Sequence, residues 1–545
     1  MKSFLFLIIV FFAFGRLYAA EWQWSVPVQS NNHPDATAYL WIPEKCEQIK
    51  AAVVSQLNME EISILESELF RKQMAEIDIA IIWISPRLDH VFNFKERAGD
   101  YFTKMMKDLA DISGYMELDY VPIIPLGHSA AASWPYYFAA WNPERTLAAL
   151  SVSGQWPYFR HPSFAPDIWN PEQNVDYIPL LETMGEYEAA ATFSSQGLKD
   201  RQEHPYMALS MLACPAEGHF ATTEEKNEYL AFYIRKAMEY RYPKKCEKGK
   251  APLLRPVNPT KTGWLMEKWK RNAGPSVPPA PIAEYTGNPA QAFWFFDEET
   301  IEKTMGYQAK HRNKKPQLVS IMQEGKVIPQ RNTHLQIEPR FISLDNGINF
   351  NLKGVFLDTV PGGSPRPEHW TGLPPGSVIR HSENEVPVKI QIISGPGKVV
   401  NDTTFSFWLR NGLGENPARY AVTFAATHQG DDEYKPAVQQ AEMIIPLRNT
   451  EGREQEIDFP EIPDKWNKET EVIQLNATSN CGLPVYYYVE SGPAKIIGDK
   501  LYLTTIPPRS KFPMKVTVVA WQYGRSSGEK IQTANNVQRV FYIME

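Results

Sequence analysis

Cysteine is scarce in this sequence. Only four cysteines occur among 545 residues, which excludes a small scaffold held together by disulfide bonds. The chain also lacks a dense run of lysine and arginine, and its formal net charge is −7. A mildly acidic chain without a basic stripe is poorly suited to a phosphate backbone, so we expect no nucleic-acid partner.

Long hydrophobic runs are lacking after the N-terminus. Lys2 precedes an almost wholly apolar run from Phe4 to Phe14, and small residues follow before Glu21. This run is too short to span a bilayer, which needs about 20 apolar residues. We therefore predict that residues 1–20 are a signal peptide and that the protein is periplasmic or extracellular, with no transmembrane segment in the mature chain. The sequence does not decide whether Cys46 and Cys246 form a disulfide in that oxidising setting.

What is present is a chain long enough for several domains, at about 100–200 residues per domain. Strand-like and helix-like runs alternate from Ala36 to Tyr242, which predicts an α/β domain with a mostly parallel sheet, assigned to residues 21–248. Predicted strands are 51–54, 77–84, 120–126, 147–152, 178–184 and 207–213, and predicted helices are 62–75, 98–112, 131–141 and 224–240.

The amino-acid composition of the sequence changes after Tyr242. Prolines become frequent, and we interpret residues 249–329 as a connector with short helices. Trp264, Trp269 and Trp294 lie in this segment. Such large side chains need burial, so the connector is expected to rest on the first domain.

An internal repeat occupies the C-terminal part. The segment Ser394-Gly395-Pro396-Gly397-Lys398 recurs 97 residues later as Ser491-Gly492-Pro493-Ala494-Lys495. Helical periodicity is lost here and period-two runs dominate, which predicts two β-sandwiches at residues 330–450 and 451–545. The second copy, around Asn476–Thr478 and Gly482–Val485, resembles the immunoglobulin-like modules of bacterial surface and secreted proteins. That resemblance implies a fold and no chemistry.

The sharpest chemical motif is Gly127-His128-Ser129-Ala130-Ala131. It follows an apolar strand and precedes a helix, the setting of a nucleophile elbow, in which a tight turn lifts a serine hydroxyl above the sheet. Gly127 supplies the small residue required two positions before Ser129. Ala131 stands where glycine is usual, which is a departure from the pattern.

A serine hydroxyl needs a base within hydrogen-bond reach. His219 is the best placed histidine, since it lies in a loop between the last predicted strand and the last helix. His128 adjoins the serine but is expected to point away from it, supporting the oxyanion loop or packing below. The imidazole in turn needs a carboxylate, and Glu188, after the strand at 178–184, is favoured over the rival Glu186.

The order Ser129, Glu188, His219 on an alternating domain resembles the α/β-hydrolase family. The resemblance implies an acyl-enzyme on Ser129. His219 would take and return the proton, and Glu188 would orient the histidine. It also implies an oxyanion hole, with one donor from the backbone N–H of Ala130 and the second from Leu57 or Asn58. The His-Gly pair common at that second place is replaced by Gln56-Leu57.

An aromatic insertion between the strands at 147–152 and 178–184 contains Trp156, Tyr158 and Trp169. These side chains form either a substrate platform or the packing of a long loop. The sequence has no metal-binding motif and no glycine-rich phosphate loop, so no metal and no cofactor are expected.

We therefore expect a fold of the α/β class: an α/β-hydrolase-type sheet flanked by helices, then a connector and two all-β immunoglobulin-like sandwiches. The expected function is that of a secreted serine esterase acting on small-molecule or polysaccharide esters, with carbohydrate-linked esters favoured. The alternative is a catalytically inactive hydrolase-fold scaffold of the cell surface or periplasm, which Ala131 and the missing His-Gly pair keep open. The oligomeric state is not indicated.

Overall fold

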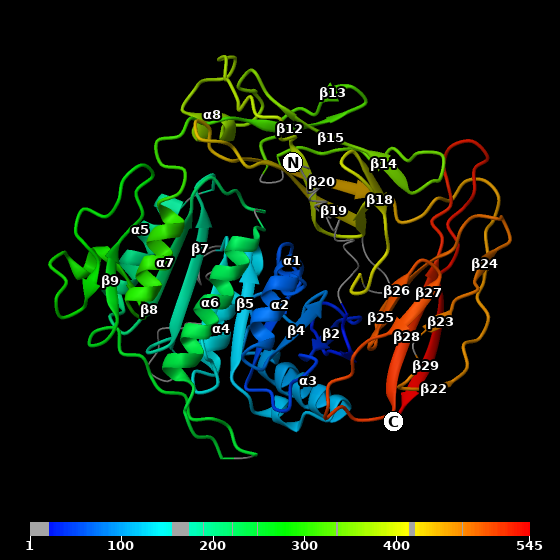
Figure 1. The fold of residues 1–545 in the computed structure, drawn as a ribbon, viewed down its shortest axis with the longest axis horizontal. Coiled ribbons are helices and arrows are strands. Elements are labelled where there is room, and N and C mark those ends of the chain that lie inside the picture. The colour runs from blue at the N-terminus through cyan, green and yellow to red at the C-terminus, as the bar shows by residue number, and fades with distance from the viewer. Residues whose placement is uncertain are drawn as a thin grey trace, which may run out of the picture.

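The computed structural model describes residues 21–154, 174–188, 190–220, 222–247, 249–333, 336–413, 420–470 and 472–545. The predicted signal peptide at residues 1–20 and the aromatic residues Trp156, Tyr158 and Trp169 lie outside these ranges. In Figure 1 the α/β domain runs from blue to green, and the β-rich C-terminal part, which begins in green and continues through yellow to red, curves over it and along one side.

One sheet forms the centre of the α/β domain. Its order is β1-β2-β4-β3-β5-β6-β7-β8. The first two strands are antiparallel to their neighbours, and every pairing from β4 through β3 to β8 is parallel. The strands are β1 (Trp24–Pro27), β2 (Thr37–Trp41), β3 (Ala51–Gln56), β4 (Ile79–Ser85), β5 (Ile123–His128), β6 (Ala149–Val152), β7 (Pro179–Gly185) and β8 (Ala208–Cys214). This mostly parallel sheet fits the predicted α/β-hydrolase fold.

The inner strands are apolar because both faces of the sheet are covered. Side chains alternate along β3, so that Ala52 joins one apolar core and Val53 the other. The first core includes α3 and α4, and the second includes α2 and α6. The helices are α1 (Glu61–Leu65), α2 (Glu68–Ala75), α3 (Ala98–Ser113), α4 (Trp134–Trp141), α5 (Ala190–Glu203) and α6 (Glu224–Arg241).

The predicted helix at 62–75 is two helices in the structure. Ser67 interrupts it with an extended backbone, and its hydroxyl accepts a hydrogen bond from the Phe70 N–H at 3.3 Å. Serine is a favoured N-cap residue because its side chain satisfies a backbone donor that the first helical turn leaves unpaired. The capping bond therefore starts α2 afresh.

The connector packs on the edge of the α/β domain next to β8, as Figure 1 shows on the left. It contains a small antiparallel sheet of β9 (Trp264–Glu267), β10 (Ala280–Pro281) and β11 (Ala292–Phe295), with η3 (Pro289–Gln291) and then α7 (Glu298–Gln308). Trp294 is buried in the same apolar core as Tyr233 of α6. The backbone carbonyl of Trp294 accepts a hydrogen bond from Ser210 of β8 at 2.7 Å.

The C-terminal part is built of small, mostly antiparallel sheets. In the first repeat the strands are β12 (Val319–Gln323), β13 (Lys326–Val327), β14 (Asn349–Asn351), β15 (Lys353–Phe356), β16 (Lys389–Ser394), β17 (Gly397–Val399), β18 (Thr404–Phe407), β19 (Tyr420–His428) and β20 (Ala437–Ile445), with α8 (Arg366–Thr371). In the second they are β21 (Ile457–Asp458), β22 (Lys465–Asn467), β23 (Val472–Gln474), β24 (Thr478–Ser479), β25 (Tyr486–Ser491), β26 (Ala494–Ile497), β27 (Lys500–Leu503), β28 (Met514–Trp521) and β29 (Val537–Met544).

The sequence repeat has a structural counterpart. β16 and β25 occupy corresponding positions, and each pairs with a long strand through a register shift just before its final serine, Ser394 or Ser491. Gly395 and Gly492 follow with φ of +93° and +127°, a backbone region that favours glycine. The immunoglobulin-like form of the repeats stays a prediction, because the first repeat is divided among three small sheets.

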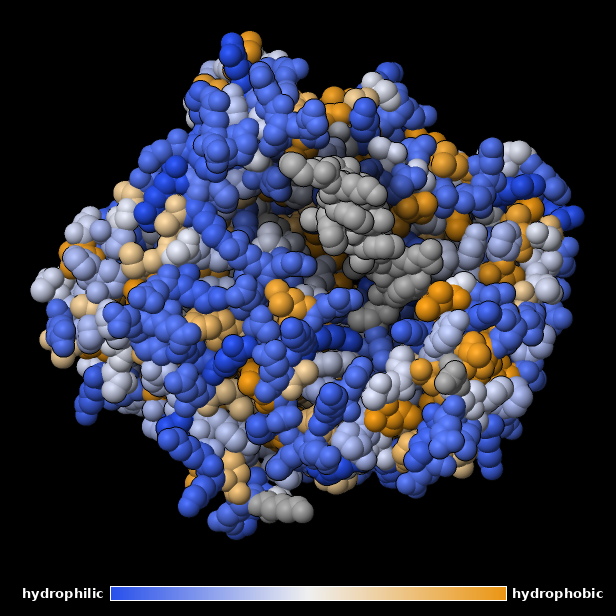
Figure 2. All heavy atoms as spheres, in the orientation of Figure 1, coloured by the Kyte–Doolittle hydropathy of each residue, from blue (hydrophilic) through white to orange (hydrophobic). Residues whose placement is uncertain are grey.

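The surface shown in Figure 2 is largely hydrophilic, with apolar residues scattered over it. None of the helices in the described ranges combines the length and the apolar character needed to cross a bilayer. All four cysteines carry free thiols, so Cys46, which is buried, and Cys246, which is exposed, are not joined.

Candidate active site

Ser129 lies in a strained turn at the carboxyl end of β5. The 3-10 turn η2 (Ser129–Ala131) follows the strand directly and leads into α4. The φ of Ser129 is +55°, a conformation that is uncommon for residues other than glycine and is found at functional sites. A Cβ on Gly127 would lie 2.1 Å from the Ala131 carbonyl oxygen. Only glycine fits at position 127, so this turn has the geometry of a nucleophile elbow.

His219 reaches this serine from the loop between β8 and α6. Its Nε2 lies 2.7 Å from Ser129 Oγ, and its Nδ1 is hydrogen-bonded to Glu188 Oε1. If Nδ1 carries the proton, as the adjacent carboxylate favours, Nε2 is free to accept the hydroxyl proton. The structure therefore brings Ser129, His219 and Glu188 together, although they come from three different loops.

Glu188 is held as a carboxylate. Burial raises its pKa, but the charge of His219 and the hydrogen bonds from His219 and the Gly185 N–H outweigh this and leave the pKa below its ordinary value. A carboxylate that accepts such bonds favours its ionised form. Glu188 can thus orient the imidazole and stabilise its positive charge.

The rival acid Glu186 lies in a different set of contacts. Its Oε1 is 2.8 Å from Lys435 Nζ and 2.8 Å from Arg271 Nε, and its Oε2 accepts the Ala216 N–H at 2.9 Å. These partners belong to the first repeat, the connector and the loop after β8. Glu186 therefore joins three parts of the chain, and Glu188 is the acid at the imidazole.

The oxyanion donors are placed only in part as the sequence predicts. Ala130 follows Ser129 in the first turn of η2, where backbone N–H groups have no intrahelical acceptor. The Leu57 N–H, in contrast, donates to the Ile84 carbonyl at 2.8 Å, and the Asn58 N–H donates to Glu61 Oε2 at 3.1 Å. Both are committed to protein acceptors, so the structure does not support the prediction of Leu57 or Asn58 as the second donor.

His128 packs below the site, as one of the two sequence interpretations proposed. It is fully buried, and burial together with the charge of His219 places its pKa well below the ordinary value. Nδ1 of the neutral ring accepts the Glu60 N–H, and Nε2 lies 2.9 Å from the His219 carbonyl oxygen. The Nε2–H group therefore donates to the backbone of His219 and fixes it from below.

Two buried acids near the elbow were missed by the sequence analysis. Glu61 accepts the Met59 N–H at 2.6 Å and the His128 N–H at 2.9 Å, so one carboxyl joins the loop after β3 to the elbow. Glu60 is 3.1 Å from Lys226 Nζ. The adjacent pair Glu60-Glu61 before an apolar helix resembles an ordinary surface turn, so the sequence carries no signal for either contact.

Glu182 of β7 gives the protein a pH-dependent stability. Burial raises its pKa to about 8, and its Oε2 accepts the Tyr136 hydroxyl at 3.0 Å. Because the folded-state pKa exceeds the unfolded one, this contribution is fully present below about pH 4.5 and is lost as pH rises through about 8. This contribution of Glu182 to the free energy of unfolding is a few kcal/mol in total, since one pKa unit corresponds to about 1.4 kcal/mol.

We therefore expect the free energy of unfolding to fall less between pH 5 and pH 8.5 in Glu182→Gln than in the wild type. Glutamine keeps the shape of the side chain and stays neutral at both pH values. Urea unfolding of both proteins at the two pH values measures this difference. A wild type and variant whose free energies of unfolding change in parallel with pH would contradict the assignment.

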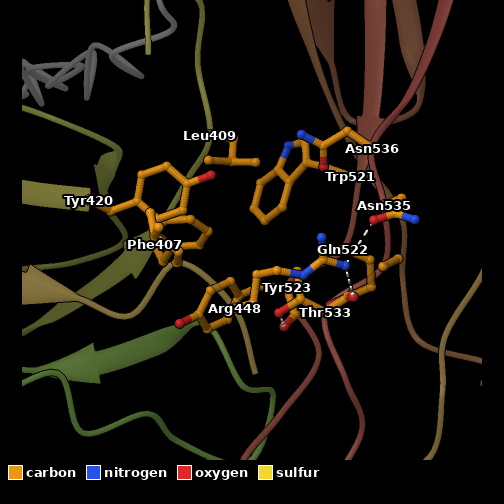
Figure 3. Close-up of a pocket in the computed structure, with 12 residues that line it drawn as sticks. Phe407, Leu409, Tyr420, Arg448, Trp521, Gln522, Tyr523, Thr533, Asn535 and Asn536 are labelled. Atoms are coloured by element: carbon orange, nitrogen blue, oxygen red, sulfur yellow. Dashed lines mark hydrogen bonds between the residues drawn. The ribbon is translucent and has the colours of Figure 1, made fainter. Parts of the chain in front are cut away.

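One pocket of the C-terminal part lies away from the serine. It has a volume of about 350 Å³ and sits where the two repeats meet, as Figure 3 shows. It is lined by Phe407, Leu409, Tyr420, Leu447, Arg448, Trp521, Gln522, Tyr523, Thr533, Ala534, Asn535 and Asn536. None of these residues belongs to the serine site. Across the described part of the chain, no three His, Cys, Asp or Glu side chains are grouped as metal ligands.

Comparisons with known proteins give only distant likenesses. No family model matches the chain, and no curated protein matches its sequence. Among solved structures, Est1E from Butyrivibrio proteoclasticus is 15% identical, with a TM-score of 0.28, over 39% of this chain and 99% of its own. The fluorophosphonate-binding serine hydrolase FphF from Staphylococcus aureus is 12% identical, with a TM-score of 0.29, over 39% and 96%.

An S-formylglutathione hydrolase from Agrobacterium tumefaciens is 13% identical, with a TM-score of 0.28, over 39% of this chain and 94% of its own. Two of these three neighbours are named as hydrolases. Each likeness covers about two fifths of this chain.

Proposed function

We propose that the protein is a serine hydrolase that forms an acyl-enzyme on Ser129. The observation that carries this proposal is the 2.7 Å contact between Ser129 Oγ and His219 Nε2, at a serine with φ of +55°. Hydrogen-bond contact between a nucleophile and a base that a third group orients is the arrangement that activates serine. A scaffold protein has no need of it.

The reaction follows from the contacts. Ser129 Oγ attacks the ester carbonyl carbon while His219 Nε2 takes the hydroxyl proton, and Glu188 stabilises the resulting imidazolium. The Ala130 N–H stabilises the oxygen that becomes negative. The tetrahedral intermediate then expels the alcohol, which receives the proton from His219. Water repeats these steps, with His219 as base, to release the acid and restore the serine hydroxyl.

For the substrate we propose carbohydrate-linked esters outside the cytoplasm. The export signal predicted at residues 1–20 and the repeated β modules, proposed to be immunoglobulin-like, support action on an extracellular polymer. The aromatic residues Trp156, Tyr158 and Trp169 are proposed as a platform for a sugar or aryl group. Screening the purified protein on acetylated and feruloylated polysaccharides tests this substrate class.

A fluorophosphonate probe tests the nucleophile itself. We expect the wild type to be labelled and Ser129→Ala and His219→Ala to lose labelling, because the probe reacts only with an activated serine. Ser133→Ala, at the start of the following helix α4, serves as the matched control and should label normally. A well-folded wild type that takes up no probe would contradict the proposal and favour the inactive scaffold.

A further inference from the structure

The first repeat touches the loop that carries His219. Gln440 lies on β20 and its side chain is buried, with 1% of the residue exposed. Its Oε1 accepts two consecutive backbone N–H groups, from His219 at 2.5 Å and from Phe220 at 3.3 Å. One side-chain oxygen, 221 residues away in sequence, thus satisfies two donors of the histidine loop.

The loop lies flat against this strand. A Cβ on Gly218 would lie 2.8 Å from Gln440 Oε1 and 2.9 Å from Val438 Cγ1. Both distances are shorter than ordinary contacts of a Cβ. Position 218 therefore has no room for a side chain, and the close approach of loop and strand depends on glycine there.

His219 is held on both sides of its backbone. The buried His128 ring binds its carbonyl oxygen from the α/β domain at 2.9 Å, and Gln440 binds its N–H from the first repeat. The direction of the imidazole toward Ser129 follows from the placement of this backbone. Only one of the two anchors belongs to the domain that carries the serine.

The same repeat also holds the loop that carries Glu188. The Tyr187 hydroxyl donates to the Pro436 carbonyl at 2.9 Å, and Trp370 Nε1 of α8 donates to the Tyr187 carbonyl at 2.6 Å. Tyr187, Phe220 and Trp370 share one apolar cluster, which also contains Val438. Figure 1 shows β19 and β20 next to the α/β domain.

We propose that Gln440 is a positioning residue for the hydrolysis and that the first repeat is a working part of the active site, in addition to any role in binding a polymer. The inference rests on the proposed function. Gln440 holds the His219 loop so that Nε2 stays within hydrogen-bond reach of Ser129 Oγ. A displacement of about 1 Å in a catalytic group costs on the order of 100-fold in rate.

The test compares kcat and KM for p-nitrophenyl acetate in three variants of the full chain. Gln440→Ala removes the acceptor and should lower kcat about 10- to 100-fold with little change in KM. Gln440→Glu keeps an oxygen at the same reach and should restore most of kcat. Ser63→Ala removes a different hydrogen bond between the α/β domain and the same repeat, from Ser63 to the Ile393 carbonyl, and should leave kcat unchanged.

The result separates positioning from folding. Active sites are counted by fluorophosphonate titration, and kcat is expressed per titrated site. If Gln440→Ala keeps the wild-type kcat per site and lowers only the melting temperature, Gln440 is structural and the inference is overturned. If Gln440→Ala does not fold, Gln440→Asn, whose oxygen is withdrawn by one methylene, must show the loss of kcat. A wild type that neither labels nor turns over ester refutes the proposed function and this inference with it, whereas equal rates in an active enzyme refute the inference alone.

Discussion

Ester turnover is expected to fall by about 10⁵-fold or more when Ser129 is replaced by alanine. The proposed mechanism makes this hydroxyl, 2.7 Å from His219 Nε2, the nucleophile, so that no attack is expected without it. His219→Ala should cost about as much, and the double variant should be scarcely worse than either single one, because residues that act as one unit are non-additive. Initial rates with p-nitrophenyl acetate measure all three.

Such a loss must not come from unfolding. The Ser129 side chain is small and its backbone is strained, so removing the hydroxyl should leave the melting temperature near or above that of the wild type. If Ser129→Ala hydrolyses ester at a rate within a factor of ten of the wild type, the nucleophile lies elsewhere and the mechanism is wrong.

Glu188→Gln and Glu186→Gln are expected to have opposite consequences. Glu188→Gln should lower kcat by about 10³- to 10⁴-fold, because an amide neither fixes the imidazole tautomer nor stabilises its charge. Glu186→Gln should leave kcat per folded molecule close to normal, since this side chain binds Lys435, Arg271 and the Ala216 N–H instead of the imidazole.

Stability should show the reverse order. Glu186→Gln leaves the buried Lys435 ammonium without its carboxylate, and breaking such a pair costs about 3–5 kcal/mol. Urea unfolding and rate measurements on both variants should therefore show that Glu188→Gln loses mainly activity and Glu186→Gln loses mainly stability. Near-normal turnover in Glu188→Gln with a large loss in Glu186→Gln would exchange the roles of the two acids.

The α/β sheet was predictable because its signals are local. Strands buried on both faces appear as continuous apolar runs, and those at 77–84 and 207–213 correspond to β4 and β8. Helix α5 was missed, since its segment contains two serines and a glycine and shows no clear apolar face. Tertiary packing, for instance of the buried Leu198, stabilises a helix that intrinsic propensity does not predict.

The acid at the imidazole was narrowed down by the sequence but was not decided by it. Glu186 and Glu188 stand two residues apart in one turn after β7, and composition does not distinguish them. The difference arises from partners far away in sequence, because Lys435 and Arg271 form ion pairs with Glu186. Glu188 is then the carboxylate in contact with His219.

The sequence by itself determined the elbow, because Gly127 and Ser129 act through backbone sterics between a strand and a turn that are adjacent in the chain. The tertiary structure alone decided which acid meets the imidazole, that Leu57 and Asn58 have other acceptors, and that Gln440 holds the His219 backbone. These outcomes depend on contacts between segments tens to hundreds of residues apart, whose proximity is fixed only when the repeat packs on the α/β domain.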